Sequence, residues 1–271
     1  MQIIAVDIGN SAIKFLAGEV HFRLPHRSTE SQADFADALT EYVASVGGSG
    51  PFFWSVVSVN DARCQQLADW IKQDRSKDRF EVITREGVPL DIVDSYRTSV
   101  GIDRLVVAYA AVSSQEADTP LIIVDAGTAV TIDFVSDSSA DGRRRFEGGI
   151  IFPGAAACLS ALNSTTADLP DVSLWSARLE ESGSLEGLLG TGTNMAIANG
   201  VRLSQAHAAA GIVSAFNRLP GAEVWITGGG AKDILELLDD EVTNHWISDS
   251  QLLLRGATTI GQQVLSNENA D

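Results

Sequence analysis

The sequence predicts an α/β protein made of two similar halves. The prediction rests on two copies of one pattern, in which an apolar strand ends at an acid and runs through a glycine turn into a second strand. The first copy is residues 3–15 (IIAVDIGNSAIKF) and the second is residues 121–133 (LIIVDAGTAVTID). At an offset of 118 residues the acids, the glycines and the strands of the two copies match. The repetition indicates an internal duplication with a ligand held between the halves.

The order of elements in the first half supports this fold class, because strands and helices alternate. Apolar residues at helical spacing predict a helix over 33–46, and the glycines after it end the helix. In order, we expect strands within 2–24, the helix over 33–46, a strand over 52–59, a helix capped by Asn60 or Asp61 that continues through Gln73, a strand over 80–84, a loop over 85–100 and a helix over 105–112.

A polar segment at 113–120 (SSQEADTP) predicts the boundary between two halves, 1–115 and 120–271. The second half restarts with the strand pair of 121–133. In order, we then expect a turn over 137–145, the segment GGIIFPG over 148–154, a helix over 155–162, an irregular stretch over 163–192, a long helix over 194–217, a strand over 223–227 and two closing helices.

The charge balance excludes some classes of partner. The 271 residues, 45% of them hydrophobic, fit one large domain or two of about 100–150 residues. With 19 Lys and Arg against 36 Asp and Glu, the net charge is −17. Nucleic acids and anionic membranes are bound mainly through Lys and Arg, so we expect neither as a partner. A small phosphorylated ligand needs only local donors and is compatible with this charge.

Several features predict a cytoplasmic protein. The N-terminus has no basic region and an acid interrupts its apolar run, which is unlike a signal peptide. No apolar run approaches the roughly 20 residues of a membrane span. The two cysteines, Cys64 and Cys158, form no CxxC motif, and two free thiols are typical of a reducing cytosol.

The two glycine turns have the composition of a phosphate site. Such a turn leaves backbone N–H groups facing an anion and lets the anion come close. The amides of residues 9–11 and 127–129 are therefore two candidate cradles, and Lys14 can reach a phosphate. Asp7 and Asp125, at the strand ends, can hold a cation directly or through water. Each turn alone is compatible with an ordinary hairpin, because Asp and Gly favour turns, but two copies in register favour the phosphate site.

Other motifs are less specific. A third glycine turn, Gly228–Gly230, follows the strand expected over 223–227 and either admits the flat face of a base or sugar or simply connects strand to helix. The chain has no GxxxxGK[ST] motif, which argues against a P-loop nucleotide fold. The histidines show no metal-ligand or triad spacing and are interpreted as surface or packing residues: His21, His26, His207 and His245.

The segment Gly101–Arg104 (GIDR), directly before an apolar helix, is the candidate reacting centre. In one interpretation Asp103 takes a proton from a substrate hydroxyl, while Arg104 binds a substrate carboxylate or a phosphate. In the other, the acid is an ordinary helix cap and the arginine is a surface charge. Composition alone leaves both interpretations open.

Together these motifs resemble the type III pantothenate kinases, members of the actin, sugar kinase and heat-shock ATPase superfamily. The matching segments, in the family's order, are DIGNSAIK (7–14), GIDR (101–104), DAGTAVTID (125–133), GGIIFPG (148–154), TADLP (166–170), GTGT (190–193) with the later Ala196 and Gly200, and TGGG (227–230). Each motif alone is weak, but seven in order across residues 7–230 are specific.

The resemblance implies the α/β actin-like ATPase fold, with two ribonuclease-H-like halves and the nucleotide in the cleft between them. It implies ATP-dependent phosphorylation of the hydroxyl of pantothenate to 4′-phosphopantothenate, the first step of coenzyme A biosynthesis. It also implies ATP with Mg²⁺, a monovalent cation (K⁺ or NH₄⁺) and a homodimer whose substrate sites border the interface.

By position, the resemblance assigns roles to individual residues. Asp103 corresponds to the general base, Thr128 to an ATP contact and Asp125 to the ligand of the monovalent cation. The first phosphate loop corresponds to Asp7, Ile8, Gly9, Asn10, Ser11 and Lys14. The pantothenate contacts correspond to Tyr96, Gly101, Ile102, Asp103, Arg104 and Thr193.

Two departures from the family pattern concern the substrate side. Thr191 and Gly192 stand where the family usually has a basic residue and an asparagine. Tyr96 stands five residues before Gly101, closer than the family's substrate tyrosine, which indicates a shortened loop. Two other functions stay open: a non-catalytic nucleotide-sensing accessory protein in transcriptional regulation, and a kinase for another small hydroxy acid. An intact Asp-Arg pair favours a kinase, because a sensor has no use for a base.

Overall fold

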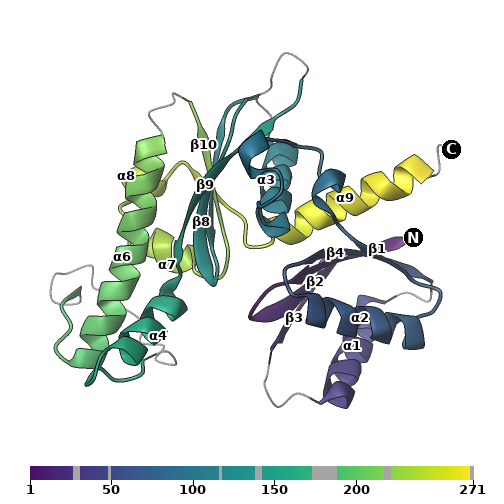
Figure 1. Cartoon of the computed structure of the whole chain (residues 1–271), viewed down its shortest axis with the longest axis horizontal. Coiled ribbons are helices and arrows are strands. Elements are labelled where there is room, and N and C mark those ends of the chain that lie inside the picture. The colour runs from purple at the N-terminus through teal and green to yellow at the C-terminus, as the bar shows by residue number, and fades with distance from the viewer. Residues whose placement is uncertain are drawn as a thin grey trace. The chain divides into compact units, whose positions relative to one another are not determined.

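The chain folds into two compact α/β units. The structure, a computed structural model, describes residues 1–26, 31–47, 50–115, 118–137, 142–172, 188–216 and 221–268. Unit 1 comprises Met1–Ala117, Ser139–Phe146 and Gln251–Asp271, and unit 2 comprises Asp118–Ser138 and Glu147–Ser250. The units are therefore discontinuous in sequence, whereas the expected halves were 1–115 and 120–271. The last helix, α9 (Leu252–Glu268), belongs to unit 1 (Figure 1).

Unit 1 is built on a mixed five-stranded sheet in the order β3-β2-β1-β4-β5. Strand β2 pairs antiparallel with β1 and β3, whereas β4 lies parallel to β1 and β5. The strands are β1 (Gln2–Ile8), β2 (Ala12–Ala17), β3 (Val20–Pro25), β4 (Phe52–Ser58) and β5 (Arg79–Val82). Each parallel step needs a crossover, which helices α1 (Gln32–Val46) and α2 (Asp61–Asp74) supply.

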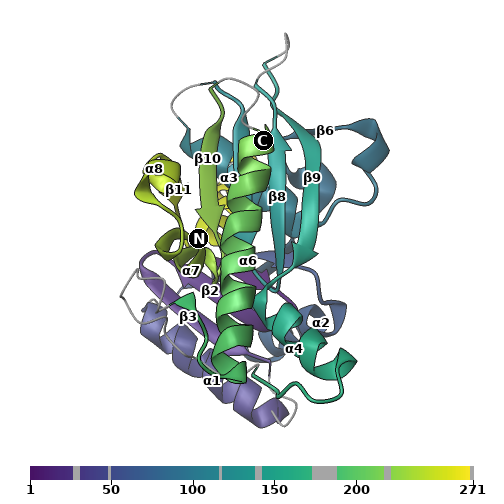
Figure 2. The same ribbon diagram turned by 90° about the vertical axis from the view of Figure 1, so that its left-hand side faces the viewer.

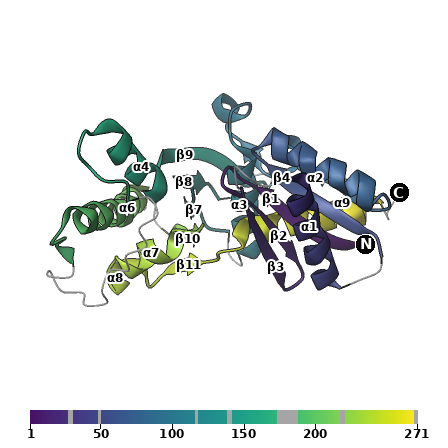
Figure 3. The same cartoon turned by 90° about the horizontal axis from the view of Figure 1, so that it is seen from below.

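The helices of unit 1 begin where the sequence provides caps. The Ser31 hydroxyl accepts from the backbone N–H of Asp34 at 3.1 Å, and the Asp34 carboxylate accepts from the Ser31 N–H, which forms a capping box. Asn60, one of the two expected caps, accepts from the backbone N–H of Arg63 at 3.1 Å. Helices α1 and α2 cover one face of the sheet, and α3 (Ile102–Ser114) and α9 cover the other (Figure 1, Figure 3).

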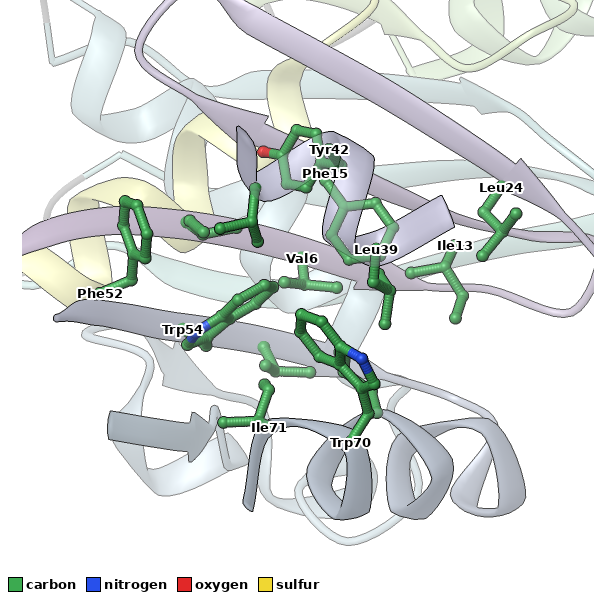
Figure 4. Packing of buried hydrophobic residues seen from close by; sticks show 14 of the residues in the cluster. Val6, Ile13, Phe15, Leu24, Leu39, Tyr42, Phe52, Trp54, Trp70 and Ile71 are labelled. Atoms are coloured by element: carbon green, nitrogen blue, oxygen red, sulfur yellow. The ribbon is translucent and has the colours of Figure 1, made fainter. Parts of the chain in front are cut away.

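Alternating side chains along β4 divide the core of unit 1 between these two faces. Trp54 points toward α2, where its ring meets that of Trp70 edge to face with centroids 6.1 Å apart (Figure 4). Ser55, the next residue, points toward α9 and donates its hydroxyl to the carbonyl of Ala257 at 2.7 Å. Strand β1, beside β4, is covered on both faces, and no residue of Ile4–Ile8 is more than 7% exposed. The end of β1 is therefore rigidly placed.

Unit 2 is built on a second sheet, in which the strands follow the order β11-β10-β7-β8-β9. Strand β7 pairs antiparallel with β8 and parallel with β10, and β10 pairs parallel with β11. The elements are β7 (Leu121–Ala126), β8 (Ala129–Val135), β9 (Arg145–Pro153), α4 (Ala155–Thr165), α6 (Thr193–Phe216), β10 (Glu223–Thr227), α7 (Ala231–Glu236), α8 (Asp240–Thr243) and β11 (Trp246–Ser248). The long helix α6 lies against β7 and β8 (Figure 2), and its small buried residues Ala206 and Ala209 allow this close approach.

The structure confirms most of the expected elements, with small shifts at their ends. Strand β9 was expected only as the segment GGIIFPG after a turn, and two short strands were not expected at all. Strand β6 (Asp91–Ile92) lies in the expected loop and pairs with the first residues of β9, Arg145 and Phe146, within unit 1. Strand β11 lies between α8 and α9, so three helices and a strand follow the third glycine turn where two helices were expected. Both strands are short and pair with distant residues, so neither leaves a local pattern.

Parts of four expected segments lie outside the described residues, namely of the boundary segment over 113–120, the turn over 137–145, the irregular stretch over 163–192 and the long helix over 194–217. The irregular stretch begins with the last turn of α4, which extends to Thr165. Within the described segments, no helix combines the length and the hydropathy needed to span a bilayer.

Candidate active site

The first glycine turn follows β1 in unit 1. Asp7, the acid near the end of β1, is 7% exposed, and its carboxylate accepts from Nζ of Lys14 at 2.9 Å. The contact follows from the strand pairing, because Lys14 stands directly opposite Asp7 in the antiparallel β1–β2 pair. Lys14, expected to reach a phosphate, thus forms an ion pair with Asp7 here. The Ile8 side chain is fully buried, so only its backbone can contribute to a phosphate site.

The tip of this turn is exposed while its carbonyl groups are engaged. Asn10 and Ser11 are exposed. The backbone N–H of Gly9 donates to the carbonyl of Ala12 at 3.1 Å. The carbonyls of Gly9 and Ser11 are each 2.9 Å from a nitrogen of His26, the first from the ring Nε2 and the second from the backbone nitrogen. The turn therefore has the open tip that an anion cradle requires.

The second glycine turn joins β7 to β8 in unit 2 and is one residue tighter. Asp125 pairs with Thr131, the sixth residue after it. Asp7 pairs with Lys14, the seventh residue after it. The expected match of the two copies therefore shifts by one residue in the second strand. As a result, Asp125 stands opposite a hydroxyl side chain where Asp7 stands opposite an ammonium group. A hydroxyl oxygen, unlike an ammonium group, can share a bound cation with a carboxylate.

The third glycine turn closes against Asp125. Strand β10 lies parallel to β7 with Thr227 opposite Asp125, and the backbone N–H of Gly230 donates to the carbonyl of Ala126 at 2.8 Å. Gly228 has φ +90°, and a Cβ at this position would lie 2.5 Å from Oδ1 of Asp125. The backbone conformation and the space therefore both require glycine here. The turn packs directly against the carboxylate that we expect to hold a cation.

Gly228→Ala is expected to displace the Asp125 carboxylate and to destabilise unit 2 by at least about 1 kcal/mol, because alanine is strained at positive φ. Thermal unfolding with increasing K⁺ measures both effects, and stabilisation by K⁺ is expected to weaken. Gly229→Ala is the matched control, since a Cβ there would have no heavy atom within 4 Å. Equal behaviour of the two variants would contradict the role given to this turn.

Asp103 lies in the first turn of α3, in unit 1. Its Oδ1 accepts from the backbone N–H of Arg104 at 2.9 Å, and a Cβ at Gly101 would collide with the same oxygen. Burial raises the pKa of Asp103 above its usual range; the backbone N–H of Arg104 lowers it, and the negative charge of Asp7 raises it again. The net result is a carboxylate more basic than an exposed aspartate, which suits a proton acceptor. The N-cap of α3 is Gly101, so Asp103 is not the ordinary cap of the alternative interpretation.

Arg104 is buried, with 7% exposure, so the surface-charge interpretation is wrong. Its Cζ lies 5.3 Å from the ring centroid of Tyr96 and 5.5 Å from that of Phe146, and its Nη1 donates to the Tyr96 hydroxyl at 2.5 Å. Aromatic contacts of this kind hold the planar guanidinium in one orientation. Nε of Arg85 donates to the carbonyl of Val100 at 2.7 Å, which fixes the loop directly before the GIDR segment.

The remaining expected site residues lie in unit 2. Thr128 is exposed at the tip of the β7–β8 turn, and Thr193 is exposed as the first residue of α6. Gly192, at the place where the family usually has asparagine, starts this helix, because its carbonyl accepts from the N–H of Ala196 at 2.9 Å. Unit 1 holds the other set, which comprises Asp7, Gly9–Ser11, Lys14, Tyr96 and Gly101–Arg104.

Sequence reasoning missed two residues beside the unit 1 site, His26 and Phe146. His26 carries no motif and contacts a turn that lies 15 to 17 positions earlier in the chain. Phe146 reaches the site only because β9 pairs with the two-residue strand β6, directly before Tyr96 and its short helical turn. Neither position has a local signal, since both depend on pairing between distant segments.

Comparison with known proteins decides the family. Residues 3–215 match a family model described as type III pantothenate kinase. The chain belongs to the type III pantothenate kinase family. A relative of that name from Rhodopirellula baltica is 38% identical over 165 residues, which cover 60% of this chain and 55% of the relative. Another from Persephonella marina is 25% identical over 266 residues, covering 91% of this chain and 95% of the relative.

Coverage differs between these type III pantothenate kinases. A third relative, from Nitratidesulfovibrio vulgaris, is 37% identical over 149 residues, which are 54% of this chain and 52% of that protein. The chain therefore matches about half the length of the more similar relatives and nearly the whole of the Persephonella protein.

Solved structures confirm the expected fold class. The activator of the 2-hydroxyisocaproyl-CoA dehydratase from Clostridium difficile, solved with bound ADPNP, aligns with a TM-score of 0.52 at 13% identity, covering 100% of this chain and 98% of that one. An archaeal actin homologue aligns with the same TM-score at 9% identity, covering 97% of this chain and 100% of that one. At such low identity these likenesses establish the actin-like ATPase fold alone.

Proposed function

We propose that this chain transfers the γ-phosphoryl group of ATP to pantothenate, giving 4′-phosphopantothenate in coenzyme A biosynthesis. Membership of the type III pantothenate kinase family supports the substrate. The observation that carries the proposal is the start of α3, where a basic Asp103 adjoins a buried, oriented Arg104. A hydroxyl acceptor needs a base and a carboxylate-bearing substrate needs a cation, and pantothenate presents both groups.

The residues at the start of α3 then take defined roles. Asp103 accepts the proton of the substrate hydroxyl as that oxygen attacks the γ-phosphorus, and the bond between this phosphorus and the β–γ bridging oxygen breaks to release ADP. Its raised pKa favours the proton transfer. Arg104 binds the pantothenate carboxylate through charge-assisted hydrogen bonds, and Tyr96 keeps the guanidinium in place. Gly101 and Ile102 border the same site, and Thr193 is the proposed contact from unit 2.

The phosphates of ATP are assigned to the turn at Gly9–Ser11 with Lys14, and Thr128 supplies a further ATP contact. The exposed tip of the first turn supports this assignment, because its amides can approach an anion. Mg²⁺ is usually bound by one or two carboxylates together with substrate phosphates, and Asp7 is the candidate carboxylate. When bound, the cation neutralises charge on the transferred phosphoryl group. Lys14 can then exchange its ion pair with Asp7 for a phosphate oxygen.

Asp125 is the proposed ligand of K⁺ or NH₄⁺. Its register opposite Thr131, whose hydroxyl oxygen can join it as a ligand, supports a cation at this position. Only the family resemblance selects a monovalent ion. A homodimer is proposed on the same basis. A cytoplasmic location is proposed because the two cysteines are free thiols, as is typical of a reducing compartment.

A pocket of about 660 Å³ within unit 2 suits the base and sugar of the nucleotide. It adjoins the third glycine turn and is lined by Gly228, Gly229, Lys232, Asn244 and Trp246 among others. Its size lies in the range of small-molecule sites, about 300–1,000 Å³. This arrangement favours the first of the two sequence interpretations of the turn, in which the glycines admit a flat ring.

The test is ADP formation by the purified chain with ATP, Mg²⁺ and K⁺, using pantothenate and a panel of other small hydroxy acids as acceptors. We expect pantothenate to support turnover, with higher rates in K⁺ or NH₄⁺ than in Na⁺. Turnover with another hydroxy acid but not with pantothenate would show that the other acid is the substrate. Nucleotide binding without turnover on any acceptor would favour a nucleotide-sensing role over a kinase.

A further inference from the structure

His26 contacts the first phosphate turn at two points. His26 follows β3 and donates to the turn twice, from its backbone N–H to the Ser11 carbonyl at 2.9 Å and from its ring to the Gly9 carbonyl at 2.9 Å. A carbonyl oxygen only accepts hydrogen bonds, so Nε2 of His26 carries the hydrogen in this contact. One residue therefore engages two carbonyl groups of a turn that is only three residues long between its strands.

We propose that His26 is a positioning residue that orients the phosphate-binding amides of this turn. The proposal rests on the proposed function, because it concerns how the turn receives the phosphates of ATP. In a planar trans peptide, the C=O and the following N–H point in opposite directions. The described residues contain no cis peptide bond. Holding the Gly9 carbonyl on His26 therefore directs the N–H of Asn10 to the opposite side of the turn.

The turn needs such an anchor because glycine does not fix its own peptide plane. Gly9 has no Cβ, so the Gly9–Asn10 peptide can rotate at little steric cost. A rotated peptide would present the Gly9 carbonyl, with its partial negative charge, where the Asn10 N–H should face a phosphate. Donors that are oriented before the ligand arrives bind it without a cost of reorganisation. The half-buried ring of His26 supplies this orientation through its contact with the Gly9 carbonyl.

Binding of a non-hydrolysable ATP analogue, measured by calorimetry, tests the proposal. His26→Ala removes the ring donor but keeps the backbone hydrogen bond to Ser11. It is expected to weaken binding of the analogue about 5- to 10-fold, as the loss of one hydrogen bond predicts. In kinetics, KM for ATP is expected to rise by a similar factor, whereas kcat and KM for pantothenate change little. His26→Gln supplies an amide donor and is expected to recover most of the affinity.

His21→Ala is the matched control, because His21 is an exposed histidine on the preceding strand β3. Wild-type affinity in His26→Ala would overturn the proposal, as would weak binding by a His26→Gln variant that unfolds at the wild-type temperature. If His26→Ala is itself unstable, the His26→Gln result decides. Wild-type protein that binds the analogue but turns over no acceptor would contradict the proposed function alone, since the binding comparison would still stand.

Discussion

Asp103→Asn is expected to lower kcat/KM for pantothenate by about 10²–10⁴-fold, the usual contribution of a general base. Asparagine cannot accept the hydroxyl proton, but its Oδ1 can still accept from the backbone N–H of Arg104, so the start of α3 keeps its geometry. A coupled assay of ADP release measures the loss. Affinity for an ATP analogue is expected to stay at the wild-type level, because the variant changes the acceptor side of the site.

The same substitution is expected to stabilise the fold at neutral pH. The folded-state pKa of Asp103 is raised, mainly by burial, so its ionised form is less favourable in the folded chain than in the unfolded one. This penalty is complete above the folded-state pKa, shrinks as the pH falls through it and vanishes below the unfolded value of about 3.9. Thermal unfolding should therefore show Asp103→Asn to be more stable than wild type at pH 7, with a difference that disappears toward acid pH.

Asp61→Asn is the matched control for the turnover measurement. Asp61 is also an aspartate in the first turn of a helix of unit 1, but it is exposed. It should leave turnover at the wild-type level. Near-wild-type turnover of a folded Asp103→Asn, or an equal loss in Asp61→Asn, would remove Asp103 from the role of base.

Arg104→Lys is expected to raise KM for pantothenate about 10- to 100-fold, in line with the loss of a hydrogen bond to a charged group. Lysine keeps the charge but has no planar fork for a carboxylate and cannot stack on the rings of Tyr96 and Phe146 in the same way. The rise in KM should exceed the fall in kcat, since the carboxylate lies away from the reacting hydroxyl. Steady-state kinetics with pantothenate varied at saturating ATP separates the two constants.

Tyr96→Phe provides the graded comparison for this prediction. It removes the hydroxyl that accepts from Nη1 of Arg104 but leaves the ring beneath the guanidinium. A smaller rise in KM, of about 2- to 10-fold, is expected from the loss of one neutral acceptor. An unchanged KM in Arg104→Lys would show that the substrate carboxylate binds elsewhere.

The elements could be predicted from the sequence where their signals are local. The alternation of apolar runs with glycine turns predicted β1, β7 and β10, and Asn60 was one of two expected caps of α2. Helical spacing likewise predicted α1, because its buried residues recur on one face. The motifs that predicted the family, such as the GIDR segment, also depend on short spacings. Short-range patterns of this kind can be recognised in a single sequence without knowledge of tertiary contacts.

Features that depend on distant pairing could not be predicted. The one-residue shift between the two glycine turns appears only in the strand register, which sets Asp125 opposite Thr131. The burial of Arg104 depends on Phe146, which arrives through the β6–β9 pair. The assignment of α9 to unit 1 reflects its packing on β1 and β4, where a Cβ at Gly261 would lie 3.0 Å from that of Ser55. These contacts join residues far apart in the chain, and their amino-acid types alone do not specify the partner.

Phosphorus NMR of the reaction of purified protein with ATP, Mg²⁺, K⁺ and pantothenate tests most directly whether Asp103 serves a pantothenate kinase. Wild-type protein is expected to produce ADP and a phosphomonoester on the primary hydroxyl of pantothenate in equal amounts. Asp103→Asn, shown to be folded and to bind the ATP analogue, is expected to produce neither at a comparable rate. If the wild type formed no phosphomonoester, the proposed function would be contradicted. If Asp103→Asn formed it at the wild-type rate, the proposed mechanism would be contradicted.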